Sequence, residues 1–160
     1  MMSTGESENK DGTVMDELEE LTYAECRALL AGGVFGRVAV CTPAGARILP
    51  VNYSVVGEAV VFRTTADGVV ATHGWDLPMA FEVDFVDYVE LRGWSVVAAG
   101  RGEAVEEPEK LALIRRTWDP RPWARGDRPL YVRLPWSDLT GRRLGRGSTR
   151  EDDLPGRWLV

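Results

Sequence analysis

The most reactive side chains in this sequence are few: two cysteines, Cys26 and Cys41, and one histidine, His73. Neither cysteine has a partner at the short spacing typical of zinc sites, so we predict no metal site. The two thiols could form one disulfide, but a reduced, apolar pair is favoured because such pairs are usual in cytosolic proteins. His73 could titrate near neutral pH, although a single histidine in a loop is weak support for catalysis.

Charged side chains near the ends of predicted strands are the next candidates. Arg63 and Thr64 end an apolar run, and a guanidinium group can form paired, charge-assisted hydrogen bonds to a phosphate. Glu82 and Asp84 are two residues apart in a strand and so point to the same face, which is either solvated or the polar rim of a pocket. The net charge of −6 argues against nucleic acid as a partner, because phosphate binding needs a basic surface.

The chain is long enough for one domain with loose ends. Residues 1–17 are polar and acidic and are predicted to form a disordered tail, residues 18–144 the domain, and residues 145–160 a loose C-terminal tail. Hydrophobic residues make up 44% and charged residues 28%, which is typical of globular proteins. Without a long apolar run or a signal-peptide core, the sequence predicts a cytoplasmic protein with no membrane partner.

Two helices are predicted, with a third short one as an option. Thr22 and Glu25 have the spacing of a capping box, so a helix is expected over residues 23–31, ending at Gly32-Gly33. Pro108 is well placed to begin a second helix. Residues 65–75 are expected to be a loop or a short helix.

The rest of the domain has the pattern of strands joined by tight turns. Turn residues at 42–45 and 57–58 separate β-branched runs, as in an antiparallel meander. A sheet of this kind removes its edges by closing into a barrel. We therefore expect a mainly β fold with two or three helices (α+β) around a six-stranded antiparallel barrel. The predicted strands cover residues 37–41, 47–56, 59–64, 79–84, 94–105 (the longest) and 130–134.

Pro50 and Asn52 are exceptions within the second predicted strand. Proline cannot donate a hydrogen bond to a neighbouring strand, so Pro50 indicates an edge or an opening of the sheet. Asn52 is polar in an apolar run, and it either faces a ligand or caps a turn.

Six stretches, in this order, resemble the pyridoxamine 5'-phosphate oxidase-like flavoprotein family, in particular its small bacterial oxidase-related members. The resemblance covers about residues 21–144. The stretches are GRVAV (36–40), ILPVNY (48–53), VVFRT (60–64), MAFEVD (79–84), GWSVVAAGRGEAV (93–105) and LTGRR (139–143).

The resemblance implies a homodimeric split β-barrel with FMN in a groove between the protomers. The second strand would line the flavin ring, and the third strand and the following loop would meet the ribityl chain and phosphate. Trp94 would lie near the flavin or plug the barrel, and Ser95 would hydrogen-bond the cofactor, across the dimer if necessary. The implied cofactor-binding residues are Arg47, Ile48, Leu49, Pro50, Val51, Asn52, Arg63, Thr64, Gly68, Val69, Trp94 and Ser95.

The loop after the third strand departs from the family pattern. Family members usually carry a lysine or arginine there, whereas this chain has Asp67-Gly68-Val69. Asp67 would repel a phosphate, although Gly68 could still offer a backbone N–H group. The sequence therefore predicts weakened FMN binding or a different natural ligand.

The function implied by the resemblance is an FMN-dependent oxidoreductase acting on an unidentified small-molecule substrate by hydride transfer at the flavin. No catalytic residue is assigned. One alternative is a variant that binds a deazaflavin or haem, for which His73 would be the available axial ligand. Another is a binding module without enzymatic activity.

Overall fold

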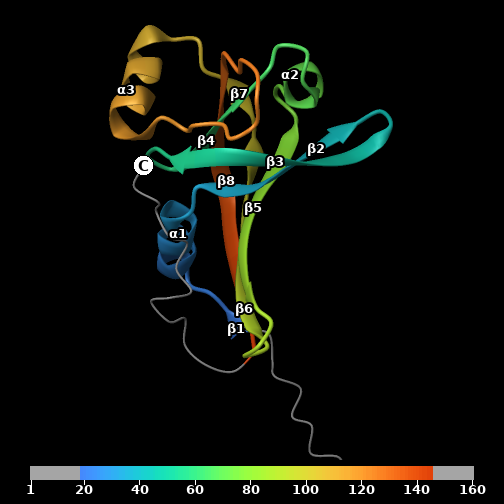
Figure 1. The fold of residues 1–160 in the computed structure, drawn as a ribbon, viewed down its shortest axis with the longest axis vertical. Coiled ribbons are helices and arrows are strands. Elements are labelled where there is room, and N and C mark those ends of the chain that lie inside the picture. Colours follow the sequence, from blue (N-terminus) through green and yellow to red (C-terminus); the bar gives the residue numbers. More distant parts are fainter. Residues whose placement is uncertain (1–18, 146–160) are drawn as a thin grey trace, which may run out of the picture.

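The structure, a computed structural model, describes residues 19–145, which contain eight strands and three helices (Figure 1). The predicted tail over residues 1–17 and residues 146–160 of the predicted C-terminal tail lie outside the described residues. The strands are β1 (Glu19–Glu20), β2 (Phe35–Thr42), β3 (Gly45–Val55), β4 (Ala59–Thr64), β5 (Pro78–Asp87), β6 (Arg92–Arg101), β7 (Glu103–Ala104) and β8 (Leu130–Leu144); the helices are α1 (Tyr23–Gly32), α2 (Val69–His73) and α3 (Pro108–Trp118).

Six of the strands close into an antiparallel barrel. Their order is β8-β4-β3-β2-β5-β6, and β6 pairs again with β8. The short strands β1 and β7 both add to β8. The hairpin of β2 and β3 extends away from the barrel on the side opposite α1 and α3 (Figure 1). This architecture confirms the predicted split barrel.

The last part of the barrel differs from the predicted strands. The stretch 94–105 is not one long strand, because β6 ends at Arg101 and β7 pairs separately with β8. The register of β6 and β8 shifts between Ala99 and Gly100, where a Cβ on Gly100 would lie 2.1 Å from the Pro135 carbonyl oxygen. The longest strand is β8, with 15 residues. The sequence predicts a strand over residues 130–134 only, but Pro135 lies beside this bulge and the strand continues to Leu144.

The first helix begins and ends as predicted. The Thr22 hydroxyl accepts a hydrogen bond from the Glu25 backbone N–H at 3.3 Å, and the Glu25 carboxylate accepts one from the Thr22 N–H at 2.8 Å, which is a capping box. Gly33 caps the other end, where a Cβ would lie 2.2 Å from the Tyr53 hydroxyl oxygen. That hydroxyl donates to the Leu30 carbonyl at 2.6 Å and joins α1 to β3.

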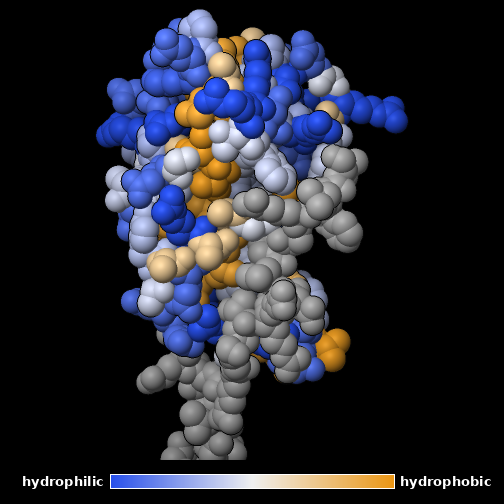
Figure 2. All heavy atoms as spheres, turned by 90° about the vertical axis from the view of Figure 1, so that its left-hand side faces the viewer, coloured by the Kyte–Doolittle hydropathy of each residue, from blue (hydrophilic) through white to orange (hydrophobic). Residues whose placement is uncertain are grey.

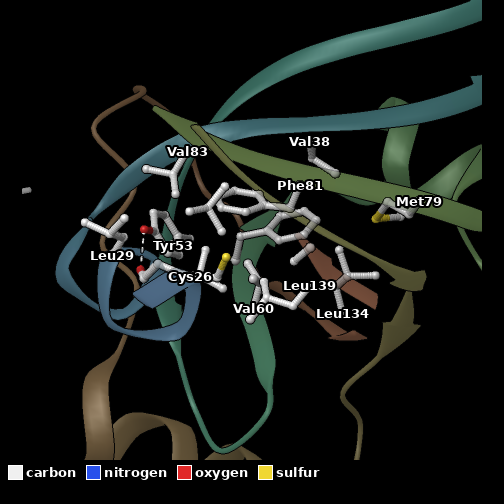
Figure 3. Close-up of a cluster of buried hydrophobic side chains, with 14 of the residues drawn as sticks. Cys26, Leu29, Val38, Tyr53, Val60, Met79, Phe81, Val83, Leu134 and Leu139 are labelled. Carbon is white, nitrogen blue, oxygen red and sulfur yellow. Dashed lines mark hydrogen bonds between the residues drawn. The ribbon is translucent and has the colours of Figure 1, made fainter. Parts of the chain in front are cut away.

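The barrel interior is filled with apolar side chains (Figure 3). Tyr53 and Phe81 are both almost fully buried, and their ring centroids are 4.5 Å apart. Cys26 is buried among these side chains and Cys41 is exposed, and both are free thiols, so the predicted apolar surroundings hold for Cys26 but not for Cys41. No described helix is long and apolar enough to cross a membrane.

A second, smaller apolar cluster lies between α3 and the outer face of β4 and β8. Val61 of β4 and Tyr131 of β8 pack there with Ile114 of α3. Because side chains alternate along a strand, Val61 and Tyr131 point away from the barrel interior, where their neighbours Phe62 and Val132 are buried. Helix α3 therefore covers the outer face of the β4–β8 pair.

Candidate functional site

Among the residues that the structure describes, one edge of β3 is open over much of its length. Residues 45–52 pair with β2 on one side, but β3 pairs with β4 only from Tyr53 to Val55. The two strands β3 and β4 therefore diverge at a fork just before Tyr53. Pro50 lies in the open stretch, which confirms that it marks an opening of the sheet.

The open edge presents backbone hydrogen-bonding groups in a regular row. The Tyr53 N–H donates to the Val34 carbonyl at 3.1 Å, so the backbone groups of Tyr53 point toward β2. In an antiparallel pair, alternate residues point their N–H and C=O groups to opposite sides. The groups that point to the free edge are therefore those of Ala46, Ile48, Pro50 and Asn52. Pro50 contributes only a carbonyl to this row, so the edge offers more acceptors than donors.

The side chains of the open stretch point to two faces. Leu49 and Val51 pack against the main core cluster, whereas Ile48 on the other face is 68% exposed. Arg47 is on the same face as Leu49 by alternation, and it is exposed. The predicted ring-lining residues therefore all lie along the open stretch of β3, but their side chains alternate between its two faces.

Asn52 is engaged by a segment that connects α3 to β8. Its Oδ1 accepts a hydrogen bond from the Trp123 backbone N–H at 2.8 Å, and its Nδ2 donates to the Val34 carbonyl at 3.3 Å. The Trp123 ring stacks on Phe35 with a centroid distance of 5.5 Å and an interplanar angle of 5°. Asn52 thus fastens residues 119–129 over the outer face of the fork. The prolines of this segment indicate only that it is irregular, so its contact with Asn52 could not be predicted from the sequence.

Thr64, Gly68 and Val69 lie together on the inner side of the fork. A Cβ on Gly68 would be 2.9 Å from the Thr64 hydroxyl oxygen and 3.0 Å from that of Thr65. Val69 packs against the main core cluster. The Gly68 N–H, which was a candidate phosphate contact in the sequence, donates to the Thr65 carbonyl at 3.2 Å. The hydroxyl groups of Thr64 and Thr65 therefore lie next to the Gly68 backbone on this side of the fork.

Arg63 points to the face opposite Thr64. Its Nε donates to the Arg128 carbonyl at 2.8 Å, and its guanidinium carbon lies 5.0 Å from the centroid of the Tyr131 ring. Tyr131 is the cross-strand neighbour of Arg63. The structure thus places the two predicted phosphate contacts, Arg63 and Thr64, on opposite faces of β4.

Trp94 and Ser95 are far from the open edge in the strand order. They lie on β6, which β2 and β5 separate from β3 on one side and β8 and β4 on the other. Trp94 is 2% exposed and belongs to the main core cluster, while Ser95 points to the outer face. Within one protomer, neither residue joins the edge of β3.

The paired carboxylates on β5 form a solvated ion-pair cluster. Arg37 Nη1 lies 2.7 Å from Asp84 Oδ1 and 3.7 Å from Glu82 Oε2, and all three side chains are about a third exposed or more. The hydrogen bond from Arg37 to Asp84 raises the pKa of the Arg37 guanidinium. These carboxylates therefore stabilise the outer face of the sheet.

His73 lies in a separate open pocket between the β2–β3 hairpin and α2. The pocket has a volume of about 380 Å³. Within residues 19–145, no group of three or more His, Cys, Asp or Glu side chains is placed to hold a metal ion. The residues that line the pocket with His73 are Cys41, Thr42, Pro43, Thr72, Trp75 and Leu77.

Comparison with known proteins agrees with this architecture. The sequence model of the pyridoxamine 5'-phosphate oxidase family matches residues 22–143. The chain belongs to this family. A relative, uncharacterized protein Rv0080 of Mycobacterium tuberculosis, is 34% identical over 133 residues, which cover 80% of this chain and 86% of the relative.

Two solved structures extend the comparison within the family fold. An FAD-binding protein from Mycobacterium smegmatis is 27% identical, with a TM-score of 0.66 over 78% of this chain and 97% of that one. An FAD- and haem-binding protein from the same organism has a TM-score of 0.60 over 84% of this chain and 78% of that one. At 16% identity, the second likeness concerns the fold alone.

Proposed function

We propose that this chain binds a flavin, FMN in the first instance, along the free edge of β3 and uses it to oxidise or reduce a small molecule. The observation that carries the proposal is the row of backbone groups on residues 46–52 that no other strand within residues 19–145 pairs with. An open edge of this length is normally covered, because exposed strand edges pair with other chains. The FAD-binding relative at 27% identity supports a flavin as the ligand.

The chemistry of this edge suits a flavin ring. The ring is planar and apolar on its faces, and its polar edge carries both hydrogen-bond donors and acceptors. The β3 edge presents carbonyls with a few N–H groups, and the apolar side chains of Leu49 and Val51 lie next to it. When bound, the flavin supplies hydride-transfer chemistry, and the chain's own residues bind and orient it.

The ribityl chain and phosphate would extend toward Thr64 and Gly68 at the inner side of the fork. The hydroxyls of Thr64 and Thr65 are close together there, but this loop carries no cation, and Asp67 is exposed on it. We therefore expect the phosphate to add less affinity than a lysine-containing loop would provide.

We also propose that two copies of the chain enclose the cofactor. Around the outer side of the fork, Ile48 is 68% exposed, Trp123 67% and Phe35 41%. Exposed apolar side chains in this concentration are typical of protein interfaces, and aromatic residues are enriched there. A partner seated on this surface would shield the ring from water and could bring its own β6, with Ser95, to the cofactor.

Hydrogen exchange of the purified protein tests the proposal at the level of single amides. FMN, riboflavin and haem are added in separate titrations, and amide exchange is compared with and without FMN. We expect FMN to slow exchange at Ala46, Ile48 and Asn52, whose N–H groups point to the free edge, and to leave Glu58 in the β3–β4 turn unchanged. Flavin binding without this protection would place the cofactor elsewhere, and haem binding that disappears in His73→Ala would favour the haem alternative.

A further inference from the structure

Two arginine side chains, those of Arg63 and Arg115, lie against Tyr131 on the outer face of the fork. The guanidinium carbon of Arg63 lies 5.0 Å from the Tyr131 ring centroid, and that of Arg115, from α3, lies 5.5 Å from it. The carbonyl of Arg128 holds Arg63 in place at 2.8 Å. Strand β4 and helix α3 thus each bring one arginine to Tyr131, and the 119–129 segment contributes the backbone carbonyl that positions Arg63.

These arginines are poorly neutralised by the protein. Within residues 19–145, neither Arg63 nor Arg115 forms a salt bridge with a carboxylate, unlike Arg37 or Arg143. Asp119 is the acidic group nearby, and it already accepts a hydrogen bond from the Tyr131 hydroxyl at 2.9 Å. Two guanidinium groups beside one carboxylate leave a local positive charge that attracts anions. In a chain with a net charge of −6, such a local excess of positive charge needs an explanation.

The orientation of the Arg63 guanidinium group is also fixed by contacts within the protein. Its Nε hydrogen bond and its stacking on Tyr131 hold the guanidinium plane, and its two Nη groups have no hydrogen-bond partner among residues 19–145. The two distances to the ring put the guanidinium carbons of Arg63 and Arg115 no more than 10.5 Å apart. A diphosphate held at both ends by hydrogen bonds of about 2.8 Å covers such a span.

We propose that Arg63 and Arg115 form a binding site for a phosphate or diphosphate group on the outer face of the fork. Figure 2 shows hydrophilic side chains on both sides of a hydrophobic strip at the height of α3. The phosphoryl group has two sources: the tail of the proposed flavin, passing around the end of β4 instead of extending toward Thr64, or a second, phosphorylated ligand. In the first case the inference rests on the proposed function, and in the second it is independent of it.

Calorimetric titration with inorganic pyrophosphate tests the site directly. We expect the wild-type protein to bind pyrophosphate, and Arg63→Gln and Arg115→Gln each to weaken binding about tenfold or more, because charge-assisted hydrogen bonds are lost. Arg116→Gln is the matched control: Arg116 neighbours Arg115 on α3, is exposed, and contacts neither Tyr131 nor Arg63. Because Arg115 is also exposed, its replacement should leave the urea midpoint unchanged, so a loss of binding in Arg115→Gln cannot result from unfolding.

Titrations with riboflavin, FMN and FAD distinguish the two sources. If the site holds the flavin tail, Arg115→Gln weakens FMN or FAD but not riboflavin, and pyrophosphate competes with FMN. If the ligand is separate, pyrophosphate binds equally well at saturating FMN. Absence of pyrophosphate binding in the wild type, or an equal loss in Arg116→Gln, would overturn the site. If riboflavin binds and pyrophosphate does not, only this inference is rejected. If pyrophosphate binds and riboflavin does not, only the proposed flavin binding is rejected.

Discussion

Tyr53 is a polar side chain enclosed almost completely in the barrel. It is 1% exposed, and its hydroxyl donates to the Leu30 carbonyl at 2.6 Å (Figure 3). The bond joins the last turn of α1 to the point where β3 leaves β4. A buried hydroxyl of this kind stabilises the fold only while it keeps its partner.

We predict that Tyr53→Phe destabilises the protein by about 1 kcal/mol, because the Leu30 carbonyl loses its donor inside the core. The measurement is urea unfolding followed by circular dichroism. Tyr88→Phe is the control, since Tyr88 is 84% exposed, and its midpoint should match the wild type. Equal stability of both variants would show that the hydrogen bond contributes nothing to the free energy of unfolding.

Among the elements, α1 is attached to the barrel through its first turn. Glu25 accepts hydrogen bonds from Thr22 at its own helix terminus, and Arg143 of β8 donates to it at 3.2 Å. Arg143 also pairs with Glu19 of β1 at 3.0 Å. The hydrogen bonds from Thr22 and then from Arg143 lower the pKa of Glu25 below its ordinary value of 4.5.

The sign of this shift gives a prediction for pH. A carboxylate whose pKa is lowered by folding stabilises the folded state above its unfolded pKa, and this contribution disappears as the pH falls below about 4.5. Glu25→Gln should therefore be less stable than the wild type at pH 7, and the difference should shrink on acidification. Glu109→Gln, on the exposed first turn of α3, serves as the control. A difference in unfolding midpoint that is constant with pH would contradict the charge-based explanation.

The 119–129 segment is an element without regular structure that depends on Asn52. We predict that Asn52→Ala speeds amide exchange across residues 120–128, because the 2.8 Å bond to the Trp123 N–H is lost. Global unfolding should change by only about 1 kcal/mol, since the Phe35–Trp123 stack and the Arg63–Arg128 bond remain. Unchanged exchange in this segment would mean that the stack alone holds it.

For the whole molecule, local patterns in the sequence predict the framework well. The capping box at Thr22, the turns and the proline at the open edge all act through neighbouring residues, and the family resemblance supplied the barrel. Contacts between distant residues could not be predicted in this way. Nothing near Arg63 in the sequence shows that it faces Tyr131, and nothing near Asn52 shows that it binds Trp123. The continuation of β8 past Pro135 likewise depends on a bulge in β6.

Assembly is the property of the whole molecule that the proposed groove requires. We predict that the wild-type protein sediments as a dimer and that Ile48→Glu shifts it toward monomer, because a charge replaces an apolar side chain that is 68% exposed at the open edge. Val89→Glu is the control, in the β5–β6 hairpin far from the β2–β3 hairpin (Figure 1). A wild-type monomer in analytical ultracentrifugation would reject the shared groove.

The central claim is that the open edge of β3 binds a flavin, and the absorbance spectrum of the purified protein, followed by a fluorescence titration with FMN, tests it most directly. We predict a flavin spectrum, or quenching of FMN fluorescence that saturates at one FMN per chain. A colourless protein that leaves FMN fluorescence unchanged would contradict the claim, and the row of backbone groups at residues 46–52 would then need another occupant.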